Sequence, residues 1–112
     1  PTSVHGQIEG SILMGIGYTL YENLKFREGR TVNPAFSKYR IPRSVDKVDI
    51  ESIFVQTNDP QGPFGAKGMG EASLLPTAAA IANAIHDAVG VQIKELPITP
   101  EKILAALREK NS

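Results

Sequence analysis

The stretch Asn58–Gly70 has the sequence NDPQGPFGAKGMG and is followed directly by Glu71. Four glycines and two prolines among these 13 residues disfavour any regular helix or strand. We therefore expect an irregular, glycine-rich loop here. A helical pattern and a strand pattern precede the loop, and two further helical patterns follow it. This arrangement predicts an α+β fold.

A buried helix is predicted over about residues 4–23. Its large apolar residues recur every four positions, at Ile8, Ile12, Ile16 and Leu20. The same stretch contains four glycines, each costing about 1 kcal/mol relative to alanine in a helix interior: Gly6, Gly10, Gly15 and Gly17. Such glycines indicate close approach to another backbone or to a ligand. Because little polar surface lies between positions 10 and 19, we expect this helix to be buried nearly all round, which a 112-residue chain can hardly achieve alone.

Between this helix and the loop, the sequence predicts a hairpin turn and then a strand. Glu28-Gly29-Arg30 is typical of a hairpin turn, and Pro34 and Pro42 block helix continuation. Residues 47–57 alternate as a strand does, and one face changes from charged to apolar along its length. We therefore expect a strand that enters a core towards its C-terminal end.

Two helices are predicted after the loop. An alanine-rich helix begins near Pro76, with Ser73 as its candidate cap, and ends near Gly90. Its apolar stripe consists of Ile81, Ile85 and Val89. The last helix has Thr99 as its expected N-cap and Pro100 as its first residue. Its expected buried side consists of Ile103, Leu104 and Leu107.

Composition limits the classes of protein to which this chain can belong. It has 112 residues, 12 Lys+Arg against 12 Asp+Glu, 41% hydrophobic residues and no cysteine. The length predicts one domain over residues 1–112. The zero net charge argues against nucleic-acid binding. The missing cysteines exclude disulfides, iron–sulfur clusters and thiol nucleophiles from this chain. No apolar run of about 18 residues predicts a membrane span, the first residues lack a signal-peptide pattern, and we expect a cytoplasmic location.

The carboxylate of Glu71 is the first candidate for chemistry. The order of Lys67 and Gly68 does not match a P-loop, and the glycine spacing does not match a dinucleotide fingerprint. Apolar neighbours such as Met69 and Leu74 could desolvate Glu71, raise its pKa and make it a general base. The alternative is a glutamate stabilised by its place near a helix N-terminus.

Other polar residues are weaker candidates. Gln7 could hydrogen-bond a ligand at the start of the glycine-rich helix, although the residue pattern alone favours an exposed first-turn residue. Neither His5 nor His86 has partners at the spacing of a metal site or a catalytic triad, and we identify no metal ligands. The cluster Lys38-Tyr39-Arg40, with Arg43, is better explained as a solvated loop or a subunit contact than as a nucleic-acid site.

Three motifs together resemble one family. Gly6–Gly10, Asn33–Pro42 and Gly62–Glu71 occur in this order and at similar spacing in the molybdenum-binding large subunit of the xanthine dehydrogenase and aldehyde oxidase family. The resemblance covers about residues 4–107 and implies that residues 1–112 are a C-terminal segment of a molybdopterin-cofactor-binding domain. It also implies a molybdenum hydroxylase, which hydroxylates an aldehyde or N-heterocycle carbon with oxygen from water.

The resemblance also implies roles for single residues. Glu71 falls on the family's catalytic base, which removes a proton from a hydroxyl group bound to molybdenum. Gln7 falls on a glutamine that hydrogen-bonds at the molybdenum–pterin centre. Gly68, Met69 and Gly70 fall on backbone that contacts the pterin. The compact loops favour the cytosine dinucleotide form of molybdopterin.

The resemblance further implies partners, because the family's other cofactor loops and substrate-orienting residues are absent from this chain. The 2Fe-2S clusters and FAD belong to other domains or subunits. We expect the rest of the molybdenum subunit, the iron–sulfur and flavin subunits and a small-molecule substrate as partners. We also expect self-association when the chain is isolated, through its apolar helix. The rival interpretation is a non-catalytic assembly domain whose glycine-rich loop packs against a partner chain.

Overall fold

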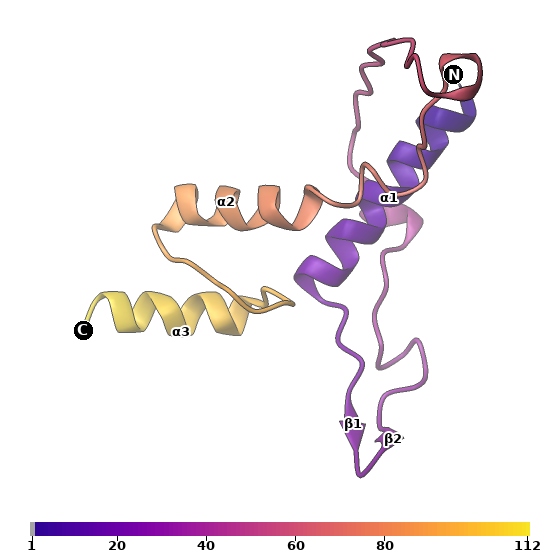
Figure 1. Ribbon diagram of the computed structural model, residues 1–112. Helices are drawn as coiled ribbons and strands as arrows, with labels where there is room; N and C mark the ends of the chain where they lie inside the picture. The colour runs from indigo at the N-terminus through magenta and orange to yellow at the C-terminus, as the bar shows by residue number, and fades with distance from the viewer. Residues whose placement is uncertain (1) are drawn as a thin grey trace.

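A long helix organises the fold, and the other elements lie along it and beyond its ends (Figure 1). The computed structural model describes residues 2–112, which form an elongated molecule of 55 × 36 × 28 Å. The elements are α1 (Thr2–Leu20), β1 (Phe26–Arg27), β2 (Arg30–Thr31), α2 (Thr77–Val89) and α3 (Pro100–Lys110). Three helices with one two-stranded sheet confirm the α+β fold class. Among the residues described, no helix has the length and apolar character needed to cross a bilayer.

The expectation that α1 is buried nearly all round is wrong for this chain. Its four buried residues, Ser11, Gly15, Gly17 and Thr19, all lie in its second half. Ile8, Ile12 and Ile16 are only half-buried, because they line a shallow apolar groove against the start of α2. The chain has too few residues to cover the remaining surface of the helix.

The glycines of α1 divide in the same way. A methyl group added to Gly15 would lie 2.6 Å from Cβ of Thr77 at the start of α2, and one added to Gly17 would meet Glu22 and Pro42. Gly6 and Gly10 have open space around them. Within the described chain, close approach therefore occurs at the two glycines of the second half of the helix and not at Gly6 or Gly10.

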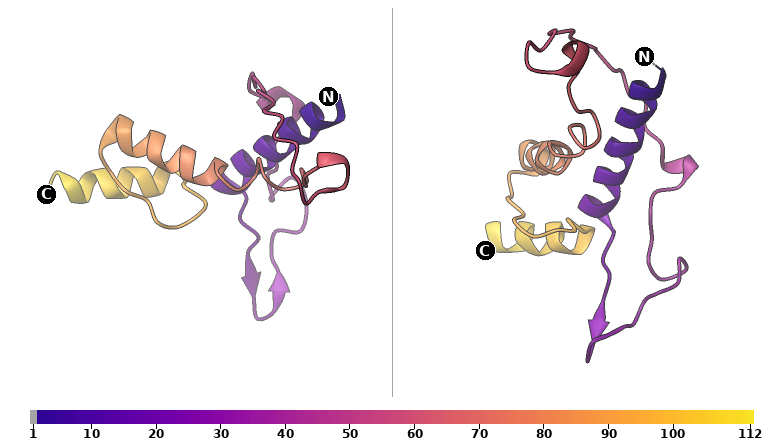
Figure 2. Two further views of the ribbon diagram at one scale, coloured as in Figure 1. Left: turned by 45° about the horizontal axis from the view of Figure 1, so that its top comes forward. Right: turned by 45° about the vertical axis from the view of Figure 1, so that its right-hand side comes forward.

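The core lies where the second half of α1 meets the start of α2 and the segment before α3. Thr19 has no exposed surface, and Ile98 is only 2% exposed. The N–H group of Ile98 donates to the carbonyl of Thr19 over 2.6 Å, which attaches the segment before α3 to the end of α1. Figure 2 shows α2 and α3 stacked beside this end of α1, and the loops at its other end.

The predicted hairpin turn is confirmed. β1 and β2 pair antiparallel, with Arg27 opposite Arg30, and the two turn residues Glu28 and Gly29 have φ of 50° and 74°. Positive φ at both central residues is typical of a tight hairpin turn. The buried side chain of Asn33 closes the base of the hairpin, since it accepts from the N–H of Lys25 over 2.7 Å and donates to the carbonyl of Asn23 over 2.8 Å.

The prediction of a strand over residues 47–57 is wrong. The segment has no regular structure, and its pattern of alternation finds no second strand to pair with in residues 2–112. A short helical turn, Ser44–Asp46, precedes it. The glycine-rich loop that follows is irregular as expected, apart from a single turn at Pro63–Gly65.

The last two helices match their predictions except in detail. Ser73 does not cap α2 with its side chain; its carbonyl instead accepts from the hydroxyl of Thr77 over 3.0 Å. Gly90 ends α2 with φ of 70°, as expected for a glycine at a helix C-terminus. Thr99 caps α3 by accepting from the N–H of Lys102. The expected buried side of α3 is not buried in the described chain, since Leu104 is 50% exposed and Ile103 and Leu107 are only half-buried.

Candidate functional site

The first turns of α1 hold two irregular segments in place through polar side chains. Nδ1 of His5 lies 3.1 Å from Oγ of Ser52, and Glu9 forms an ion pair with Lys47 over 3.1 Å. On the other segment, Nε2 of Gln7 donates to the carbonyl of Gly70 over 2.8 Å. The glycine-rich loop and the segment before it therefore both attach to the same end of the helix.

The contact between Gln7 and Gly70 brings together two of the sequence-predicted motifs. It joins residues 63 positions apart, and Gly70 directly precedes Glu71. Glu71 is exposed and forms no ion pair with any residue in the range 2–112. The expected desolvation of Glu71 is absent in this chain, because Gly70 and Ala72 are themselves exposed and do not cover its carboxylate.

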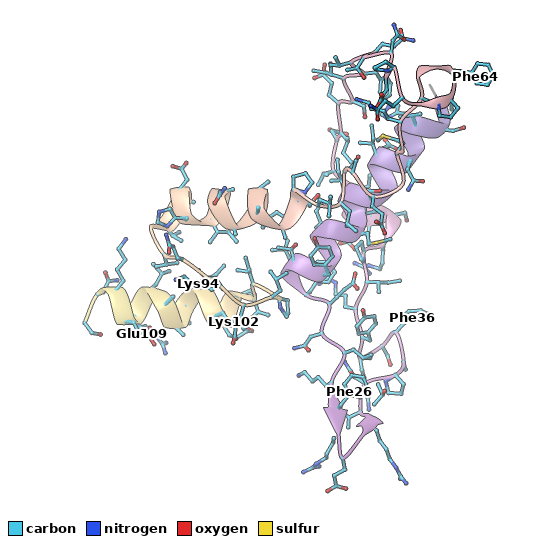
Figure 3. All side chains as sticks on the ribbon, viewed as in Figure 1. Phe26, Phe36, Phe64, Lys94, Lys102 and Glu109 are labelled. Atoms are coloured by element: carbon cyan, nitrogen blue, oxygen red, sulfur yellow. The ribbon has the colours of Figure 1, made fainter. Side chains whose placement is uncertain are left out.

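The backbone before Glu71 is bare on its outer side. Gly68 and Gly70 are exposed, and a methyl group added to either would meet nothing within 4 Å. Within the described chain, the N–H groups of residues 67–70 donate to no other backbone group. Backbone donors that lack side chains and partners are suited to close contact with a bulky polar ligand. Phe64 points away from the molecule at the tip of the same loop (Figure 3).

An open groove of about 680 Å³ lies between the first turns of α1 and the two irregular segments. Val4 and Ile8 form its helix side, residues 53–56 form a second side, and residues 67–69 form the third. Gly68 and Met69 are part of this lining, whereas Gln7 and Glu71 lie outside it. Phe54 and Lys67 also line the groove, although no sequence motif indicates that role for either residue. The apolar end of the segment 47–57 was the only signal for Phe54.

The histidines form no reactive cluster. The ring of His5 forms a hydrogen bond with Ser52, and Nδ1 of His86 lies 3.3 Å from the carbonyl of Val91, at the end of α2. Neither contact provides the carboxylate that orients a catalytic or metal-binding histidine.

The basic cluster of residues 38–43 makes its contacts within the chain. Arg40 and Arg43 both pair with Asp46, and the hydrogen bonds from Arg43 lower the pKa of the Asp46 carboxyl. The guanidinium of Arg40 also lies over the ring of Tyr21, 4.6 Å from its centroid, and burial raises the pKa of the Tyr21 hydroxyl. The hydroxyl of Tyr39 donates to Glu22 over 2.7 Å, which raises the Tyr39 pKa. These cations therefore serve internal contacts.

Comparison with known proteins identifies the family of this chain. Residues 1–48 match the model of a molybdopterin cofactor-binding domain. The chain is 40% identical over 105 residues to a putative xanthine dehydrogenase molybdenum-binding subunit of Escherichia coli K12, and 38% identical over 110 residues to an aldehyde oxidoreductase molybdenum-binding subunit of the same strain. These alignments cover 92% and 96% of this chain, but only 14% and 15% of the two relatives.

A solved structure agrees with these relatives. Quinoline 2-oxidoreductase from Pseudomonas putida 86 superposes with a TM-score of 0.88 and 36% identity, over 97% of this chain and 14% of that chain. The chain thus spans about 14% of the length of the proteins it matches. It belongs to the family of xanthine dehydrogenase and aldehyde oxidoreductase molybdenum-binding subunits, and corresponds to a segment of their molybdopterin cofactor-binding domain.

Proposed function

We propose that this chain contributes one side of the active site of a molybdenum hydroxylase, with Glu71 as its general base. The observation that carries the proposal is the hydrogen bond from Gln7 to the carbonyl of Gly70, which places the glutamine motif beside the residue that precedes Glu71. The exposed carboxylate of Glu71 forms no ion pair in the described chain, so it is free to act on a substrate.

The residues present fit a molybdopterin cofactor. The exposed N–H groups of residues 67–70 and the absence of side chains at Gly68 and Gly70 provide the bare donors that a pterin edge needs. Gln7 uses one amide hydrogen for Gly70 and keeps its second hydrogen and its Oε1 for the cofactor. When bound, the molybdenum cofactor supplies the oxygen-transfer and two-electron chemistry of the reaction.

This chain's own contribution is proton transfer and positioning. A carboxylate oxygen of Glu71 accepts a proton in the step that generates the nucleophile, as a general base does. The Gln7 contact fixes the backbone immediately before the base, which limits the positions that its carboxylate can reach. The largely apolar groove beside Met69 lies along one side of the loop.

We further propose the finer features of the activity. The substrate is a small aldehyde or N-heterocycle, hydroxylated at carbon with oxygen from water. The cofactor is the cytosine dinucleotide form, and 2Fe-2S clusters and FAD on other domains or subunits carry the electrons away. The whole protein is cytoplasmic. These features are supported by the family to which the chain belongs and by the names of relatives such as the aldehyde oxidoreductase subunit.

The test is the substitution Glu71→Gln in the complete, cofactor-loaded enzyme. The amide keeps the size of the side chain but cannot accept the proton, so we expect kcat to fall at least about 10²-fold while the molybdenum and pterin contents stay unchanged. The matched control is Glu109→Gln on α3, which is exposed and remote from the loop (Figure 3) and should leave kcat unchanged. Near-normal turnover of Glu71→Gln would reject Glu71 as the base and favour the assembly-domain interpretation.

A further inference from the structure

The hairpin of β1 and β2 carries a pair of arginines beside its turn. Arg27 on β1 lies directly opposite Arg30 on β2, and both residues are exposed. Residues that lie directly opposite each other in an antiparallel pair extend their side chains on the same face, where like charges destabilise the pairing. The hairpin therefore holds two guanidinium groups on one face at a cost in its own stability.

No carboxylate of the described chain neutralises this pair. Within residues 2–112, neither Arg27 nor Arg30 forms an ion pair, and Glu28 in the turn between them forms none either. By contrast, Arg43 is held by Asp46 over 3.2 Å. Arginine is suited to binding a carboxylate through two parallel hydrogen bonds. The two arginines of the hairpin are therefore available to carboxylates from another molecule.

The other face of the hairpin is aromatic. Phe26 pairs with Thr31, and the alternation of a strand places these two side chains on the face opposite the arginines. Phe26 is 64% exposed, and Phe36, which follows the hairpin in the chain, is 77% exposed. Figure 3 shows both phenylalanines on the arm of the molecule that ends in the hairpin. Arginine and aromatic residues are enriched in protein–protein interfaces.

The arm is fixed at both ends of the hairpin. The tight turn at Glu28 and Gly29 closes its tip, and the side chain of Asn33 closes its base through hydrogen bonds with Lys25 and Asn23. A preformed arm loses little conformational freedom on binding, which favours affinity. In Figure 1 the hairpin projects beyond one end of α1, whereas the glycine-rich loop lies at the other end. A partner at the hairpin would therefore leave the candidate site uncovered.

We propose that the hairpin docks onto an acidic surface of a partner subunit, whose carboxylates bind Arg27 and Arg30. The charge of the unpaired arginines selects an acidic surface. A second copy of this chain is a poorer fit, because a symmetric contact through the hairpin would bring the arginines of both copies together. This inference rests on the proposed iron–sulfur and flavin subunits, and it is independent of Glu71 as the base.

The experiment measures Kd between the complete molybdenum-binding subunit and each purified partner subunit, the iron–sulfur and the flavin subunit, by surface plasmon resonance. Arg30→Glu reverses one charge and places it opposite Arg27, so the hairpin itself should remain stable. We expect Kd for at least one partner subunit to rise at least about 10-fold. The matched control is Arg108→Glu on α3, an exposed arginine without an ion pair in residues 2–112, which should leave Kd unchanged.

The dependence on salt tests the charge of the contact. Raising the ionic strength from about 0.01 M to about 0.15 M shortens the Debye length from about 30 Å to about 8 Å, and it should weaken the unsubstituted complex more than the Arg30→Glu complex. Equal salt dependence of the two complexes would overturn the proposal.

Other outcomes would also reject a partner subunit at this hairpin. The proposal is wrong if Arg30→Glu and Arg108→Glu have the same Kd, or if the unsubstituted subunit binds neither partner. A loss of thermal stability or of molybdenum and pterin in the Arg30→Glu subunit alone would show that the remainder of the same subunit covers the hairpin. A loss of self-association without a change in Kd would identify a second copy as the occupant. None of these results bears on the turnover of Glu71→Gln, which tests the base separately.

Discussion

The two halves of α1 differ in how they are held. The second half, residues 11–20, contains all four buried residues of the helix and approaches α2 so closely that Gly15 has no room for a methyl group. The first half, residues 2–10, contains no buried residue, and its polar side chains reach two irregular segments. The candidate site lies at the open half. The packed half therefore supports the fold, and the open half carries the site at which we propose that the cofactor binds.

The largest expected effect comes from filling the close approach in the packed half. Gly15→Val would place methyl groups against Cβ and Cγ2 of Thr77, which lie 2.6 and 2.7 Å from the first added carbon. We expect the free energy of unfolding to fall by about 3 kcal/mol, as in other overpacked cores. The measurement is urea denaturation of the purified protein.

The matched change in the open half should have the opposite sign. Gly10 is exposed in the interior of α1 and has nothing within 4 Å, so Gly10→Ala should raise the free energy of unfolding by about 1 kcal/mol. If Gly10→Ala destabilises the complete subunit but stabilises the isolated chain, further protein covers the open half. Small effects of equal size from Gly15→Val and Gly10→Ala would contradict the difference in packing between the two halves of α1.

An effect smaller than that of Gly15→Val is expected at Thr19. Its hydroxyl donates to the carbonyl of Gly15 over 2.6 Å in a site with no exposed surface. Thr19→Val keeps the branched shape and loses this hydrogen bond, which should lower the free energy of unfolding by about 1 kcal/mol in the same urea measurement. A neutral or stabilising result would mean that apolar packing alone holds this end of the helix.

The smallest effect concerns the ion pair between Arg43 and Asp46. Folding lowers the pKa of the Asp46 carboxyl from 3.8. The stabilising contribution of Asp46 is therefore present at a pH above the pKa of the unfolded state, and it is lost as the pH falls through the lower pKa of the folded state. The titration of the Asp46 carboxyl carbon, followed by NMR, should have its midpoint below 3.8, and Arg43→Ala should move it back up. A midpoint at or above 3.8 in the unsubstituted protein would contradict this arrangement.

Local chemistry explains which elements could be predicted from the sequence. The hairpin turn at Glu28 and Gly29, the N-cap at Thr99 and the left-handed Gly90 all depend on neighbouring residues, and all were predicted. The strand over residues 47–57 was wrong because a strand needs a partner, and residues 2–112 do not provide one. The near-complete burial of α1 failed for the same reason.

The candidate site was predictable in part. The motif pattern identified both Gln7 and Glu71, but no local rule could show that Gln7 bonds the carbonyl of Gly70, since 63 positions separate them. The exposure of Glu71 also differs from the expected burial, because the apolar residues near it in sequence do not lie over it in space. The sequence was enough to name Gln7 and Glu71 as candidates, whereas the solvation of the Glu71 carboxylate depends on what surrounds the loop.

The long separation between Gln7 and Gly70 has a consequence for the order of folding. Closing a loop of this length costs about 4 kcal/mol in chain entropy, whereas one exposed hydrogen bond returns about 1 kcal/mol. The contact therefore cannot form by itself during synthesis, when Gln7 has left the ribosome long before Gly70. We expect it to form after α1 and α2 have docked at Gly15 and Thr77, because that docking brings the ends of the loop together. The candidate-site end of α1 is thus expected to become ordered later than the packed half.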